Sequence, residues 1–138
     1  MLSSHEYSKP VDIWSLGCSL AELLSRQILF KAKDYIKQIK LIFDTLGTPP
    51  AEDLKFITNE NAKKYVESLP TKPSISVKEF IKYENSDCLD LLDKMLVINP
   101  LKRITADEAL KHKYFENLHD DVDEPVFEGE IDFAFEYD

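Results

Sequence analysis

Residues 9–24, KPVDIWSLGCSLAELL, decide the fold, because apolar side chains recur there at helical spacing on nearly every side. Pro10 suits the first turn of a helix, where its missing N–H costs nothing. The sequence therefore predicts a helix over 10–25, and its all-round apolar character predicts a central, buried position. One carboxylate, Asp12, stands near the start of this helix beside Trp14, the only tryptophan of the chain. An acid on a helix expected to be buried requires an explanation.

The rest of the chain also follows helical periodicity, and no convincing strand pattern precedes residue 126. An amphipathic helix is expected over 34–46, ended by Gly47, and a short one over 59–68. A further helix is expected over 86–97, capped by Ser86. Thr105 and Glu108 have the spacing of a capping box, which opens a helix running to about Lys113. The predicted fold class is all-α.

Charge is distributed unevenly along the 138 residues, whose net charge is −9. Residues 116–138 contain ten Asp or Glu and no Lys or Arg, so the remaining 115 residues carry +1. This acidic segment argues against nucleic acid as a partner and for a cationic one. No apolar run is long enough to span a membrane, and a membrane is not expected as a partner either.

Two cysteines, Cys18 and Cys88, lie in apolar helical patterns with no CxxC spacing and no nearby histidine. The pattern is typical of small buried side chains in a reducing compartment, rather than of a metal or redox site. We therefore expect a cytoplasmic or nuclear location and no metal site.

Several segments together resemble the lower lobe of eukaryotic protein kinases, and more narrowly that of mitogen-activated protein (MAP) kinases. They are VDIWSLGCSLAELL (11–24), IFDTLGTP (42–49), the Tyr65–Pro70 pattern YxxSLP, LDLLDKMLVINPLKRITADEALKHKYF (89–115) and DDVDEP (120–125). The resemblance implies that 1–115 form part of a kinase domain with a MAP kinase-type insert at about 48–80. It implies that 116–138 form an acidic docking segment and a C-terminal tail.

The kinase motifs for phosphoryl transfer do not occur in these 138 residues. A kinase requires a Gly-rich phosphate loop, an HRD catalytic loop and a DFG metal-binding segment. The chain has three glycines, none in a GxGxxG pattern, and neither HRD nor DFG occurs. The resemblance thus implies a complete Ser/Thr kinase that uses Mg-ATP. This chain alone is expected to lack the upper lobe and the catalytic loop, to bind no cofactor and to be inactive.

Three residues resemble supports of a kinase active site. Asp12 and Trp14 fit the DxWSxG pattern, whose acid accepts backbone hydrogen bonds from the catalytic loop; the alternative is a first-turn acid favoured by the helix dipole. Arg103 resembles the arginine that pairs with the APE glutamate, a motif absent from this sequence. Arg103 is therefore expected to lack its partner or to turn to solvent, and the alternative is an ordinary surface arginine.

The resemblance also implies two docking surfaces. Asp120 and Asp123, with Glu124 beside them, match the acidic site that binds basic docking peptides of upstream kinases, substrates and phosphatases; the alternative is a solvated acidic turn. A second, apolar pocket would be formed by Met1, Leu2, Tyr35, Ile36, Ile39 and Tyr65. Ile36 and Ile39 would alternatively belong to the core stripe of their helix. The sequence ILFKA (28–32) departs from the family's Pro-Gly turn just before this helix, which affects the shape expected for the pocket.

Two other functions are compatible with these features. In the first alternative, the chain is a non-catalytic docking module or decoy that binds MAP kinase partners. In the second, it is an unrelated helical adaptor. The first alternative shares every docking residue with the kinase interpretation, so the upstream reading frame would distinguish them. The second does not explain the ordered motifs.

Overall fold

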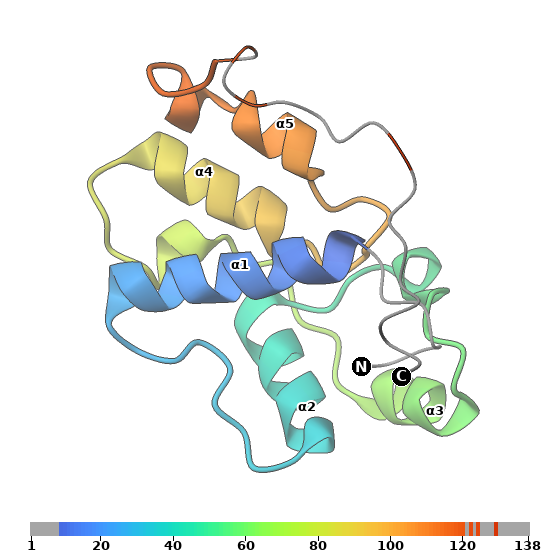
Figure 1. The fold of residues 1–138 in the computed structure, drawn as a ribbon. Coiled ribbons are helices and arrows are strands. Elements are labelled where there is room, and N and C mark those ends of the chain that lie inside the picture. Colours follow the sequence, from blue (N-terminus) through green and yellow to red (C-terminus); the bar gives the residue numbers. More distant parts are fainter. Residues whose placement is uncertain (1–8, 121, 123, 125–128, 130–138) are drawn as a thin grey trace, which may run out of the picture.

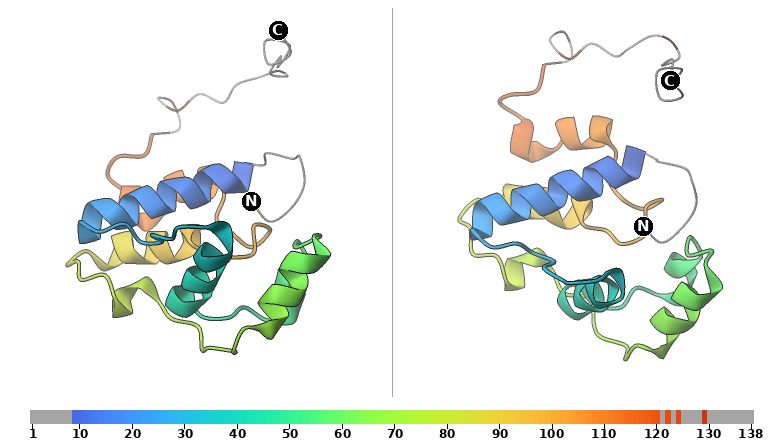
Figure 2. Two further views of the ribbon diagram at one scale, coloured as in Figure 1. Left: turned by 90° about the horizontal axis from the view of Figure 1, so that it is seen from below. Right: turned by 60° about the horizontal axis from the view of Figure 1, so that its bottom comes forward.

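The computed structural model describes residues 9–120, 122, 124 and 129, and it is entirely helical over these residues, which confirms the predicted fold class (Figure 1). The elements are α1 (Lys9–Ser25), α2 (Tyr35–Leu46), η1 (Ala51–Leu54), α3 (Glu60–Ser68), η2 (Val77–Glu79), α4 (Ser86–Met95), α5 (Ala106–Leu110) and η3 (Lys113–Phe115), where η denotes a 3₁₀ turn. Helices α1 and α4 lie side by side in the middle of the molecule, with α5 on one side of them and α2 and α3 on the other (Figures 1 and 2).

The main core lies between α1 and α4. Gly17 permits the two helices to pack closely, because a Cβ built there would lie 3.1 Å from both Met95 Cβ and Leu96 Cδ2. The central cluster of buried residues consists of Ala21, Val77, Ile81, Leu89, Leu92 and Leu96. A larger residue at 17 would push α1 away from this cluster.

The expectation that α1 is buried on every side is wrong. Only Ile13, Gly17 and Ala21 are buried, and they recur at intervals of four residues on one side. On the opposite side, Leu16 and Leu23 are 58% and 69% exposed. Periodicity reports how many sides of a helix are apolar, whereas burial depends on which sides have a neighbour.

Helices α2 and α3 form a second apolar cluster through Ile39, Phe43, Ile57, Ala62 and Val66. Each helix begins at a capping side chain. Asp34 accepts a hydrogen bond from Lys37 N at 2.8 Å, and Asn59 accepts from Asn61 N and Ala62 N at 3.0 Å. These caps satisfy N–H groups that a helix start leaves without a partner. The second cluster therefore rests on two short helices with well-defined starts.

Polar contacts join this part to α4. Both oxygens of Asp93 accept hydrogen bonds from the start of η2, one from its cap residue Ser76 Oγ at 2.5 Å and one from Val77 N at 2.8 Å. Asp53 accepts from the buried Asn99 Nδ2 at 2.9 Å and pairs with Lys102 Nζ at 2.6 Å. The insert-like stretch 48–80 is thus attached through Asp53 to the loop that follows α4, and through Ser76 and Val77 to α4 itself.

Two helix boundaries differ from those expected. Helix α4 is capped by Asn85, whose side chain accepts from Asp87 N and Cys88 N, and not by Ser86. The Thr105–Glu108 capping box is confirmed, but α5 ends at Leu110 rather than near Lys113. His112 starts the separate turn η3 instead, because its Nδ1 accepts a hydrogen bond from Tyr114 N at 3.2 Å.

Candidate functional site

The N-terminal end of α1 meets the loop after α4 at Arg103. The Arg103 guanidinium donates to the backbone oxygens of Val97 at 2.9 Å, Ile98 at 3.1 Å and Pro10. Its Cζ also lies 4.9 Å from the ring centre of Trp14, at cation–π distance. One side chain therefore fixes the end of α1 against the loop that follows α4.

Of the two outcomes expected for Arg103, exposure to solvent is wrong, because backbone carbonyls and the Trp14 ring surround its guanidinium. No carboxylate pairs with it in the part of the chain that the structure describes. Burial lowers the pKa of Arg103 to about 10, so the group is still charged at neutral pH.

Trp14 has a second aromatic neighbour that the sequence analysis did not identify. The ring of Phe30 stacks on Trp14, with centroids 5.7 Å apart and planes 9° from parallel. Phe30 belongs to the stretch that departs from the family pattern, and it is buried. An isolated aromatic after a helix was the only signal for this contact.

Asp12 lies on the exposed side of α1. Within the described residues its carboxylate takes part in no hydrogen bond or ion pair. Its first-turn position suits the positive end of the helix dipole. The acid is therefore accessible to solvent, and nothing in the described chain contacts its carboxylate.

The acidic segment begins directly after η3. Asp120 is exposed, and its Oδ1 accepts a hydrogen bond from Val122 N at 2.9 Å, which forms a tight turn. Glu124 Oε2 lies 2.7 Å from His119 Nδ1. Asp123 lies outside the described residues. The carboxylates of Asp120 and Glu124 therefore both belong to a turn that follows the folded body.

The sequence analysis did not identify His119 as part of this segment. It is half-buried and contacts Glu124, so it connects the acidic turn to the body of the protein. A histidine five residues before a glutamate is not a distinctive pattern, and only the geometry of the turn brings the two together.

The residues expected to form the apolar docking pocket lie in different environments. Tyr35 is 68% exposed at the start of α2, whereas Ile39 is buried in the second cluster. Ile36 is half-buried, and Tyr65 packs on the edge of the same cluster. Met1 and Leu2 lie outside the described residues. Ile39 is therefore a core residue here, and Tyr35 and Ile36 are the ones that a partner could reach.

The two cysteines lie in or near the core, with Cys88 buried and Cys18 half-buried. Burial raises the pKa of the Cys18 thiol to about 11, against an opposing effect of the Arg103 charge. A thiol of this kind is protonated at neutral pH and is a poor nucleophile. Within the described ranges no group of three metal-ligating side chains comes together, and no helix is long and apolar enough to cross a membrane.

Comparison with known proteins agrees with the helical body and its motifs. Residues 1–115 match the protein kinase domain family. The chain is 52% identical over 126 residues to mitogen-activated protein kinase spk1 of Schizosaccharomyces pombe, covering 91% of this chain and 34% of that protein. It is 45% identical over 136 residues to mitogen-activated protein kinase 5 of Arabidopsis thaliana, covering 99% of this chain and 36% of the relative.

A third relative is extracellular signal-regulated kinase 1 of Dictyostelium discoideum, 44% identical over 136 residues, which are 99% of this chain. The chain spans between 26% and 39% of the length of these and similar curated relatives. The order of its motifs, its helical body and these matches lead to one conclusion: the chain belongs to the protein kinase family, and its relatives within that family are MAP kinases.

Proposed function

We propose that the chain is the lower-lobe portion of a MAP kinase-type Ser/Thr kinase, and that it supplies a docking site for basic peptides. The complete kinase would transfer the γ-phosphoryl group of Mg-ATP to protein hydroxyls in the cytoplasm or nucleus. Its partners would be upstream kinases, substrates and phosphatases that carry Lys- and Arg-rich docking peptides. No nucleic acid or membrane partner is proposed.

The observation that supports docking is the acidic turn after η3. Asp120 is exposed, and its Oδ1 is held by Val122 N, so its position is defined while its other oxygen stays accessible. Glu124 supplies a second carboxylate four residues later. The sequence places a third acidic residue, Asp123, between them. Clustered carboxylates attract a basic peptide at long range and speed its encounter.

Asp12, Trp14 and Arg103 would have a supporting role in the complete kinase. The Arg103 contacts place the first turn of α1 firmly against the loop after α4. Asp12 then projects from a fixed helix end with its carboxylate free to accept backbone N–H groups of a catalytic loop. A rigid acceptor of this kind holds such a loop in one conformation.

The docking proposal is tested by titrating a fluorescent peptide that contains a run of arginines and lysines. Replacing Asp120 and Asp123 by Asn removes two charges, so we expect the affinity to fall about tenfold at low salt and less at high salt. Fluorescence anisotropy over a salt series measures both effects.

The matched control is the double variant Glu67→Gln and Glu84→Gln. These two acids are exposed and lie in other parts of the molecule, one in α3 and one before α4. The control removes the same net charge, so it separates a local site from the general effect of an acidic chain. Equal losses in the two double variants would contradict a docking site at Asp120 and Asp123.

A further inference from the structure

His112 connects two elements through its imidazole ring. It lies between α5 and η3, and only 9% of its side chain is exposed. Nδ1 accepts a hydrogen bond from Tyr114 N at 3.2 Å, and this bond caps η3. Nε2 lies 2.8 Å from Asp90 Oδ2 on α4. One ring therefore holds η3 and α4 together.

These two contacts determine which ring nitrogen carries the proton of the neutral form. Nδ1 faces a backbone N–H, so it must accept, and Nε2 faces a carboxylate, so it must donate. Asp90 also accepts from Lys94 Nζ at 2.6 Å. The hydrogen bonds from Lys94, and then from His112, lower the pKa of Asp90 below its ordinary 3.8. Asp90 is therefore charged throughout the range in which histidines titrate, at about pH 5–8.

A second proton on the ring removes one of these contacts and keeps the other. Both nitrogens of a charged imidazole are donors. Nδ1–H then faces Tyr114 N–H, so the bond that caps η3 is lost. Nε2–H still donates to Asp90, and a hydrogen bond between two charged groups is stronger than one from the neutral ring. The charged ring thus stays on α4 without holding η3.

Two charged groups of α4 act directly on the ring. Lys94 Nζ lies 3.2 Å from Nε2 and repels a charged ring, but Asp90 Oδ2 lies closer, at 2.8 Å. Of the described carboxylates, only that of Asp90 contacts the ring. The attraction to Asp90 therefore exceeds the repulsion from Lys94.

The charged residues farther around the ring are paired among themselves. Lys113 Nζ pairs with Asp87 Oδ2 at 3.4 Å. Lys102 Nζ pairs with Asp53 Oδ1 at 2.6 Å. The complete set of charged residues that line this surface beside the ring and its two contacts is Asp87, Lys102, Glu108, Lys111 and Lys113. Because both signs are mixed in this set, the two groups in direct contact decide where a charged ring lies.

The turn η3 carries two aromatic side chains toward the core. Tyr114 and Phe115 pack against a cluster of three buried residues from α1 and α4. Their rings are in edge contact, with centroids 5.0 Å apart. Without the bond to Nδ1, this packing and the bond from Phe115 N to His112 O at 2.8 Å still hold the turn. Loss of the cap should therefore loosen η3 without unfolding the molecule.

We propose that His112 is a pH-sensitive cap, whose neutral ring fastens η3 to α4 and whose charged ring stays on α4 and releases η3. The acidic segment begins directly after η3, so its start is held less firmly when the ring is charged. Every group involved lies in α4, in η3 or at the residue that precedes η3. The inference therefore does not rest on the proposed docking function.

NMR on the isotope-labelled 138-residue chain, from about pH 8 to about pH 5, tests this exchange of contacts. At the upper pH, the nitrogen shifts of the His112 ring should show Nε2 with a proton and Nδ1 without one. As the ring becomes charged, the protection of the Tyr114 amide against solvent exchange should fall about fivefold, as expected for one hydrogen bond. The Leu92 amide, in the middle of α4, is the internal reference and should keep its protection.

His112→Asn is a variant that keeps the cap but cannot gain a proton. Asn59 and Asn85 already cap helices of this chain by accepting from the backbone N two residues later. His112 and Tyr114 have the same spacing. The Tyr114 amide of this variant should therefore keep the same protection at every pH.

Two further variants separate the ring from its surroundings. His119→Asn removes the other histidine of the described chain, and it should leave the pH dependence of the Tyr114 amide unchanged. Asp90→Asn removes the charge that keeps the protonated ring on α4. At the lower pH, nuclear Overhauser contacts between the His112 ring and α4 should persist in the wild type and disappear in this variant.

Three results would overturn the inference. The first is protection of the Tyr114 amide that stays constant while the His112 ring titrates. The second is an equal loss of protection at Leu92, which would mean that the whole molecule opens. The third is a pH dependence of the Tyr114 amide that persists in His112→Asn, which would assign it to another group.

Discussion

Arg103 connects two segments that are 93 residues apart, because it donates both to Pro10 O and to carbonyls of the loop after α4. A guanidinium has several donors in a fixed plane, which is why one side chain serves three acceptors. Arg103 also stacks on Trp14 and so covers one ring face. The arginine acts as a structural connector in this molecule.

Replacing Arg103 by Met should destabilise the fold by about 2–4 kcal/mol, because charged hydrogen bonds to three carbonyls are lost. Urea unfolding monitored by Trp14 fluorescence measures the change. Arg26→Met is the control, since that arginine is exposed and has no ion pair among the described residues. A loss no larger than that of the control would show that the carbonyl contacts add nothing.

Asp53 makes stability depend on pH. Hydrogen bonds from Lys102, and then from Asn99, lower the pKa of this carboxyl below its ordinary 3.8. The folded state therefore binds this proton more weakly than the unfolded state does. The stabilisation is complete above pH 3.8 and is lost as the pH falls through the lowered value.

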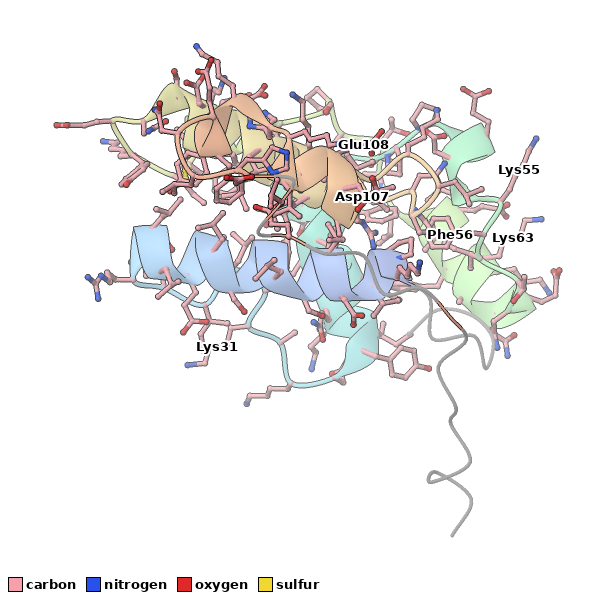
Figure 3. The ribbon with its side chains drawn as sticks, turned by 45° about the horizontal axis from the view of Figure 1, so that its top comes forward. Lys31, Lys55, Phe56, Lys63, Asp107 and Glu108 are labelled. Atoms are coloured by element: carbon pink, nitrogen blue, oxygen red, sulfur yellow. The ribbon has the colours of Figure 1, made fainter. Side chains whose placement is uncertain are left out.

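The variant Asp53→Asn should accordingly melt below wild type at pH 7, and the two should converge as the pH falls below 3.8. Differential scanning calorimetry over a pH series gives the comparison. Asp107→Asn, at an exposed acid on α5, serves as the control (Figure 3). A gap between wild type and Asp53→Asn that stays constant with pH would exclude the ion pair as its cause.

Helix α2 shows how an element ends through a tertiary contact. Gly47 has φ +89°, and a Cβ there would lie 2.2 Å from Pro73 O. Beyond it, Thr48 N donates to Lys72 O at 3.1 Å, and Ile75 N donates to Leu46 O at 3.0 Å. The glycine therefore both ends the helix and lets residues 72–75 pass close to it.

Gly47→Ala should cost roughly 2–4 kcal/mol, since both the backbone conformation and the space oppose a side chain. Gly17→Ala should cost less, because its nearest obstacles are side-chain atoms 3.1 Å away. Thermal unfolding of the two variants ranks them. The opposite order would mean that the α1–α4 contact is the tighter of the two.

The helices themselves could be predicted from periodicity, but their exact ends and environments could not. The capping box at Thr105 was recognised because its two side chains interact within one turn. The cap of α4 was assigned to Ser86 because Ser86 and Asn85 both suit a cap, and only the structure selects Asn85. The Arg103 contacts and the Phe30–Trp14 stack could not be predicted, because they join segments distant in sequence.

The molecule as a whole has the helical body of a kinase lower lobe without the motifs that position a phosphoryl group. At its surface, Lys55 and Lys63 project outward near α3, and Asp107 and Glu108 lie at the start of α5 (Figure 3).

The acidic turn at 119–124 could be located from sequence because it is a local pattern. Its link to the body through His119 could not, since that needed the geometry of the turn.

The 138-residue chain should transfer no phosphate to a MAP kinase substrate in the presence of Mg-ATP. Transfer requires a Gly-rich loop, an HRD loop and a DFG segment, and none of them occurs in its sequence. A radiolabelled ATP assay with a complete MAP kinase as positive control measures this. Turnover that persists after repurification would contradict the expectation.

Two apolar clusters, one around α1 and α4 and one around α2 and α3, have a consequence for how this protein unfolds. Contacts between Asp53 and the loop after α4 help to hold the second cluster against the first. Because acid removes the charge of Asp53, it weakens the connection while leaving each cluster its own buried side chains. We therefore expect α2 and α3 to open before α1 and α4 as the pH falls, and amide hydrogen exchange over a pH series measures this order.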